Sequence, residues 1–133
     1  MKKFLCPIIG VDGTFFKGTM KGTLLIAVGH DPNNQIYPIV WAVVQAETGD
    51  NWLWFMKNLE ADLGFEDGSG YVIISDRCKG LYLVLLKPSC QMQREHRFCV
   101  KHICVNLKKN HTGKDLLKKH MWNVAWSCNL TAY

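Results

Sequence analysis

Residues 7–14 read PIIGVDGT and residues 71–76 read YVIISD, and these two stretches decide the fold of the chain. Each is an apolar run, typical of a buried strand, that leads into an aspartate, Asp12 or Asp76. A carboxylate in that position is costly to bury unless it meets a partner or a cation, so the pair indicates a shared metal site. An aspartate also caps turns and helices well, and the sequence does not decide between these two roles.

Length and composition describe one ordinary domain. The 133 residues are 48% hydrophobic and 20% charged, which is a globular composition with enough apolar residues for one core. No apolar stretch approaches the ~20 residues that cross a bilayer, and the apolar run after Met1 is too short for a secretory signal. We therefore expect no membrane association, a cytoplasmic or nuclear location, and six cysteines that are present as thiols.

Charge is divided unevenly along the chain. Residues 1–76 hold five Lys or Arg against nine Asp or Glu, a net −4, whereas residues 77–133 hold eleven against two, a net +9. The basic half is the half expected to face a polyanion such as nucleic acid, because Lys and Arg neutralise phosphates. A solvated basic face without a ligand is the alternative, and the nucleic-acid-binding residues stay unknown. The candidate lysines are Lys101, Lys108, Lys109, Lys114, Lys118 and Lys119.

Three strands are predicted in the first half of the chain, over residues 6–16, 23–29 and 37–46. The segments between them, 17–22 and 30–35, are short and rich in Gly, Pro and Asn, which marks connecting turns. Because connections of this length join antiparallel neighbours, the three strands are expected to form a meander.

The apolar spacing then changes to three and four residues, which predicts a helix with Asp50 as its N-cap and Gly64 as its stop. Its apolar stripe is expected to pack on the sheet as core, and not to bind a ligand. The stripe comprises Trp52, Phe55, Met56, Leu59 and Leu63.

A fourth strand is predicted over residues 71–75, and because it follows a helical crossover it should run parallel to a strand already laid down. Further elements are expected downstream. They are a helix over 79–87 that Pro88 ends, a short fifth strand within 95–100, a helix over 101–109, and a last helix after Gly113 that carries Leu117, Met121, Val124 and Ala125.

This order is that of a ribonuclease H-like α/β fold, in which a mixed sheet of three antiparallel strands and a parallel fourth is flanked by helices. The first and fourth strands of that fold are neighbours, about 4.8 Å apart, so Asp12 and Asp76 fall at matching strand ends. Two Mg²⁺ or Mn²⁺ ions held about 3.5–4 Å apart between carboxylates can activate an attacking water and stabilise a leaving oxygen in phosphoryl transfer. We therefore expect Asp12 and Asp76 to be catalytic metal ligands.

Several motifs resemble the plant Mutator-like element (MULE) transposases. They include residues 11–14 (VDGT), 22–25 (GTLL), 33–39 (NNQIYPI), 74–77 (ISDR) and 96–102 (HRFCVKH). The resemblance runs from about residue 9 to residue 114, and the combination is specific although each motif alone is weak. It implies a fragment of a transposase catalytic domain.

By this resemblance, Asp12 and Asp76 match the first two acids of an Asp-Asp-Glu triad, and Cys99 and His102 match a Cys-x-x-His element. The third acid is expected downstream of Tyr133, so the fold is expected to be truncated before the final catalytic helix. Residues 1–110 are then a partial ribonuclease H-like core, and residues 111–133 begin a helical insertion. The resemblance blurs over residues 83–93.

The Cys-x-x-His element is not expected to bind zinc. A structural zinc site needs four ligands, and no second pair follows at zinc-finger spacing. His96, Cys104, His111 and His120 offer ligand atoms without a pattern. Packing or hydrogen bonding is therefore the expected role of Cys99 and His102.

The resemblance implies a nuclear protein that acts on DNA, cutting and joining it by two-metal chemistry in its full-length form, where it can also form a homo-oligomer. The present chain is expected to be inactive alone, because two carboxylates leave the metal pair with too few ligands. The alternative is a domesticated descendant that binds DNA and regulates transcription without catalysis. A decayed element without function is a third reading.

Overall fold

The computed structural model of the chain describes residues 8–31, 33, 35–64, 71–87 and 95–127. The chain divides into two compact units, Met1–Arg97 and Phe98–Tyr133. The predicted domain boundary after residue 110 concerns the organisation of the whole protein and stays a prediction. Within the described ranges, no helix is long and apolar enough to cross a membrane.

A mixed sheet organises the first unit, and β5 spans the boundary to the second. The described elements are β1 (Ile8–Phe15), β2 (Thr23–His30), β3 (Ile36–Val44), α1 (Gly49–Leu63), β4 (Val72–Ser75), α2 (Lys79–Leu85), β5 (His96–Phe98), α3 (Val100–Asn110) and α4 (Lys114–Trp126). The strand order is β3-β2-β1-β4-β5. β1, β2 and β3 pair antiparallel, and β4 pairs parallel with β1. The predicted α/β fold, meander and parallel fourth strand are confirmed.

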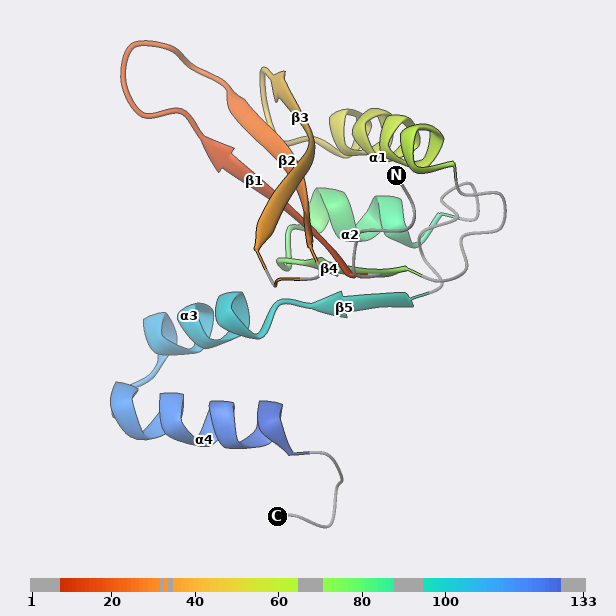
Figure 1. Ribbon diagram of the computed structural model, residues 1–133. Coiled ribbons are helices and arrows are strands. Elements are labelled where there is room, and N and C mark those ends of the chain that lie inside the picture. Colours follow the sequence, from red (N-terminus) through yellow and green to blue (C-terminus); the bar gives the residue numbers. More distant parts are fainter. Residues whose placement is uncertain (1–7, 32, 34, 65–70, 88–94, 128–133) are drawn as a thin grey trace. The chain divides into compact units, whose positions relative to one another are not determined.

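One face of this sheet packs against α1 and α2 (Figure 1). Alternate residues of β1, such as Ile9 and Val11, are buried there, as the two-residue period of a strand requires. The predicted stripe of α1 lies in the same cluster, so its assignment to the core is confirmed. The cluster comprises Ile9, Val11, Leu25, Ala27, Trp52, Phe55, Met56, Leu59, Leu63, Ile73, Leu81, Val84 and Leu85.

The ends of α1 correct one prediction and confirm another. The N-cap is Thr48 and not Asp50, because the Thr48 Oγ1 atom accepts a hydrogen bond from the Asn51 backbone N–H at 3.3 Å. Asp50 lies inside the first turn instead, where its charge meets the positive end of the helix dipole. Gly64 ends the helix with φ 60°, a left-handed conformation that glycine adopts without cost.

The second unit, Phe98–Tyr133, contains α3 and α4, which pack against each other. Cys99 is the N-cap residue of α3, and its side chain makes no capping hydrogen bond. Gly113 has φ 78° and precedes α4, so the predicted start of the last helix is confirmed. Of the apolar residues predicted on α4, Leu117 and Met121 are half-buried, while Val124 is exposed.

Candidate functional site

Asp12 lies within β1, which continues to Phe15, and Asp76 directly follows β4, so the two aspartates are not at matching strand ends as expected. β1 and β4 run parallel with Gly10 opposite Ile74 and Val11 opposite Ser75, so Asp12 and Asp76 are the next pair in this register. Val11 and Ser75 are buried on the helix-covered face. Because successive side chains of a strand alternate between faces, Asp12 belongs to the face opposite Val11, on a strand about 4.8 Å from β4.

Backbone N–H groups hold one oxygen of each carboxylate. The Gly13 N–H donates to Asp12 Oδ1 at 2.9 Å, and the Cys78 N–H donates to Asp76 Oδ1 at 2.9 Å. Asp76 therefore caps the turn that enters α2, which is the alternative role considered for it. A carboxylate offers about four lone-pair positions, so capping leaves it able to bind a cation as well.

The donor chemistry of this pair fits Mg²⁺ or Mn²⁺, since both ions prefer carboxylate oxygens. The pair alone is only part of a site. In the part of the chain that the structure describes, no group of three or more His, Cys, Asp or Glu residues is placed to hold a metal ion. Further ligands would have to come from water, substrate or other residues.

Comparison with known families identifies the chain. The family model of the MULE transposase domain matches residues 8–106, well over half of the sequence. The chain belongs to the MULE transposase family. A search of curated proteins found no match. The matched range contains the whole described sheet of this MULE transposase domain, including both aspartates and the Cys99–His102 element.

Glu47 is a third acid near the pair, and sequence reasoning missed it. In the MULE transposase domain, Glu47 follows β3 and precedes α1, and its Oε1 atom accepts a hydrogen bond from Trp52 Nε1 at 3.2 Å. A Cβ atom added at Gly13 would lie 2.9 Å from the same Oε1 atom. A single acid between a strand and a helix carries no motif, so only the fold brings it beside residue 13.

His96, the first residue of β5, contacts the residue that precedes Asp76. Its Nε2 atom is 2.8 Å from the Oγ atom of Ser75, the residue before Asp76. Burial, and then the positive charge of Arg97, lower the pKa of His96 below its ordinary value of 6.5. His96 was one of the residues without a pattern in the sequence, and the sheet alone brings it to β4.

Cys99 and His102 belong to the start of α3 and are both half-buried. Cys99 is the N-cap residue of α3, its carbonyl accepts a hydrogen bond from the Ile103 N–H at 3.1 Å, and His102 lies three residues on in the first turn. Within the described ranges they belong to no group of three potential metal ligands. The role of the element stays a prediction.

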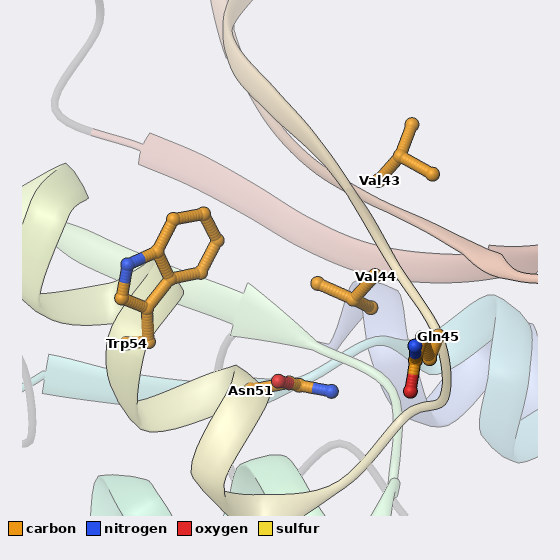
Figure 2. Close-up of a pocket in the computed structure, with 5 residues that line it drawn as sticks. All are labelled: Val43, Val44, Gln45, Asn51 and Trp54. Atoms are coloured by element: carbon orange, nitrogen blue, oxygen red, sulfur yellow. The ribbon is translucent and has the colours of Figure 1, made fainter.

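A shallow hollow of about 420 Å³ lies elsewhere in the first unit, between the end of β3 and α1 (Figure 2). Its lining residues are Val43, Val44, Gln45, Asn51 and Trp54. Neither aspartate lines it, and it is therefore separate from the acidic pair.

Proposed function

We propose that this domain, in the full-length transposase, cuts and joins DNA by phosphoryl transfer that depends on Mg²⁺ or Mn²⁺. One observation carries the proposal: β1 and β4 pair in parallel with Val11 opposite Ser75, and Asp12 and Asp76 are the residues that directly follow this pair. Two carboxylates so close repel each other, and a divalent cation between them removes that repulsion.

The residues of the chain have defined tasks in this proposal. The Gly13 and Cys78 N–H groups each fix one carboxylate oxygen, which orients the two side chains before metal or DNA arrives. Asp12 and Asp76 then supply oxygen ligands from two different strands, so the rigid sheet sets their separation. The bound metal would supply an activated water or hydroxyl nucleophile and charge stabilisation of the leaving oxygen.

DNA is the proposed partner, and the basic half of the chain supports it. Residues 77–133 carry a net +9, with eleven Lys or Arg against two acids. Lysines exposed on α3 and α4 include Lys101, Lys118 and Lys119. Such residues neutralise backbone phosphates without reading sequence. A nuclear location follows for a protein that acts on DNA, and plant origin stays an expectation.

The first test is catalytic. The 133-residue protein, incubated with supercoiled plasmid and Mg²⁺, is expected to leave the plasmid intact, because two acids are too few for a two-metal site. The full-length transposase is expected to cut it, and Asp12→Ala or Asp76→Ala is expected to abolish the cutting. Cutting by the full-length protein that survives both substitutions would overturn the proposed role of the pair.

The charge division also supports a second candidate, a regulator that binds DNA without catalysis. If the protein is such a regulator, the full-length protein binds DNA but does not cut it, even when Mg²⁺ or Mn²⁺ is present. Asp12→Ala then has no effect on its regulation of transcription. A plasmid assay beside a reporter-gene assay separates the two candidates.

A further inference from the structure

We infer that Glu47 is the positioning residue of the acidic pair: it connects the loop before α1 to β1, beside Asp12, and to the turn that holds Asp76. This inference rests on the proposed function, since it concerns the geometry of the same site. Three contacts carry it, and each reaches a different element.

The first contact is with β1. A Cβ atom at Gly13 would lie 2.9 Å from Glu47 Oε1, closer than real Cβ atoms are found, and 3.1 Å from the carboxyl carbon. Gly13 shows no positive φ, so the missing side chain, and not backbone freedom, is what the position requires. The carboxylate of Glu47 therefore fills the space beside the residue that follows Asp12.

The second contact is with the core. Trp52 is fully buried, and its indole N–H donates to Glu47 Oε1 at 3.2 Å. Trp52 also packs edge to face against Phe55, with ring centroids 5.8 Å apart. The Trp52 ring is therefore fixed by the Phe55 contact as well as by the hydrogen bond to Glu47. Because the buried Trp52 ring cannot move freely, its N–H holds the Glu47 carboxylate in one orientation.

The third contact is with the turn after β4. Cys78 is the N-cap residue of α2, and a Cβ atom at Gly80 of that helix would lie 3.3 Å from the Gly49 backbone N and 3.4 Å from the Thr48 carbonyl carbon. The backbone N–H of Cys78 donates to Asp76 Oδ1. The start of α2 thus lies against the residues that follow Glu47 and, at the same turn, holds Asp76.

Close packing of the two helix starts brings these groups together. A Cβ atom at Gly80 would lie 3.3 Å from the Gly49 backbone N and 3.4 Å from Trp52 Cδ1. Glycine at position 80 therefore lets the first turn of α2 approach the first turn of α1. Glu47 lies at this junction, where a small displacement of either helix would move Asp76 relative to Asp12.

The contacts assign Glu47 to positioning and not to metal binding. Among the described residues, no group of three or more His, Cys, Asp or Glu is placed to hold a metal ion, so Glu47 does not complete a site with Asp12 and Asp76, whereas its Oε1 atom does accept a hydrogen bond from the core. A positioning role needs a hydrogen-bonding side chain of this length, whereas a ligand role needs its negative charge. Glu47→Gln separates the two, because the amide keeps the length and an acceptor oxygen but loses the charge.

The experiment compares ¹⁵N-labelled 133-residue variants by two readouts. The first, which needs no metal, is the hydrogen-exchange protection of the Cys78 amide. The second is broadening of the Gly13 and Cys78 amide signals by Mn²⁺. The variants are Glu47→Ala, Glu47→Gln and, as a charge-matched control on the exposed surface of α1, Asp62→Asn. Asp12→Asn tests the metal site itself.

Glu47→Ala is expected to lower the protection of the Cys78 amide about tenfold and to weaken the Mn²⁺ effect, because it removes the acceptor of Trp52, whose ring packs against Gly80 at the start of α2. Glu47→Gln and Asp62→Asn are expected to keep both within about twofold of the parent protein. A folded Glu47→Ala protein with unchanged protection overturns the inference. So does a Glu47→Gln protein that behaves like Glu47→Ala, since charge and not position would then matter.

A second variant serves if Glu47→Ala does not fold. Gly13→Ala displaces the Glu47 carboxylate without removing it, and is expected to lower protection at Cys78, which lies on another element. Gly10→Ala is the matched control on β1, since its added Cβ meets Val28 and not Glu47. Equal protection of Cys78 in both glycine variants overturns the inference.

The two proposals fail separately. If the full-length transposase shows no Mn²⁺ effect that Asp12→Asn removes, the metal site of the proposed function is wrong. The protection of the Cys78 amide still decides the role of Glu47, because that readout contains no metal.

Discussion

Trp52 shows how one side chain serves both the core and the site. Its ring is buried under the sheet, and its indole N–H reaches out of the core to Glu47. The other tryptophan of this helix, Trp54, is 53% exposed beside the hollow of Figure 2. Two residues apart on one helix, they face opposite environments because a helix turns about 100° per residue.

Trp52→Phe is therefore expected to lower the free energy of unfolding by about 1–3 kcal/mol, because the variant loses a hydrogen bond and leaves a small cavity. Trp54→Phe is the matched control and is expected to change it by less than about 0.5 kcal/mol. Urea unfolding followed by circular dichroism measures both. Equal losses in the two variants would contradict the role assigned to Trp52.

His96 makes stability depend on pH. Because burial and Arg97 lower its pKa in the fold, the unfolded chain binds the proton more readily than the folded chain. The free energy of unfolding is then expected to fall as the pH drops through 6.5 towards the folded-state pKa, and the His96 contribution levels off below it. Above 6.5 the contribution of neutral His96 is fully present.

The measurement is urea unfolding between about pH 7.5 and pH 5, with the His96 titration followed by NMR. His96→Gln is expected to flatten the pH dependence, whereas His111→Gln, at an exposed position, is expected to leave it unchanged. An NMR midpoint for His96 above 6.5 would show that the sign is wrong.

At the scale of elements, the caps of α1 determine where the helix begins and thereby where Glu47 lies. Thr48 immediately follows Glu47 and holds the first turn through Asn51. Asn51 in turn donates from Nδ2 to the Ala46 carbonyl at 2.8 Å, on the other side of Glu47. The acid is thus flanked by two hydrogen bonds that shape its loop.

Thr48→Ala is expected to cost about 1 kcal/mol of stability, and Thr48→Ser to restore most of it, since serine keeps the capping oxygen. Asp50→Ala acts only through the helix dipole, so its cost of about 0.3–1 kcal/mol should shrink in high salt. Thermal unfolding in low and high salt distinguishes them. If Asp50→Ala loses more stability than Thr48→Ala in high salt, Asp50 and not Thr48 is the N-cap residue.

At the scale of the whole molecule, charge and chemistry are divided between different parts of the sequence. The acidic pair belongs to the sheet unit, and exposed lysines belong to the α3 and α4 unit. A positive helical surface raises the local concentration of DNA, whatever its sequence. Affinity and chemistry should therefore respond to different substitutions.

The double substitution Lys118→Gln, Lys119→Gln is expected to weaken DNA binding and to lower the slope of log K against log salt by about two, because each lysine that neutralises a phosphate adds nearly one to that slope. Lys57→Gln, at an exposed position of α1, is the control and should leave the slope unchanged. Fluorescence anisotropy with labelled duplex DNA at several salt concentrations provides the slopes. If all three lysines contribute equally, the division of charge has no role in binding.

Local sequence patterns were enough to predict most of the helices and strands. The apolar runs around Ile9 and Ile73 and the helical stripe from Trp52 to Leu63 are local patterns, and burial acts on them wherever they occur. The crossover helix then required β4 to run parallel, and the strand order put Asp12 beside Asp76. Periodicity and connectivity predicted a parallel fourth strand, and the order of a ribonuclease H-like fold predicted that its neighbour is the first strand.

Only the tertiary structure decided what surrounds the pair. Glu47 meets Gly13 and Trp52 because two helices start close together, and His96 meets Ser75 because β5 lies beside β4. The cap of α1 is Thr48 instead of Asp50 for a related reason, since backbone geometry selects among adjacent polar residues that all have the right chemistry. Contacts between residues far apart in sequence have no local pattern, and the packing of the domain fixes them.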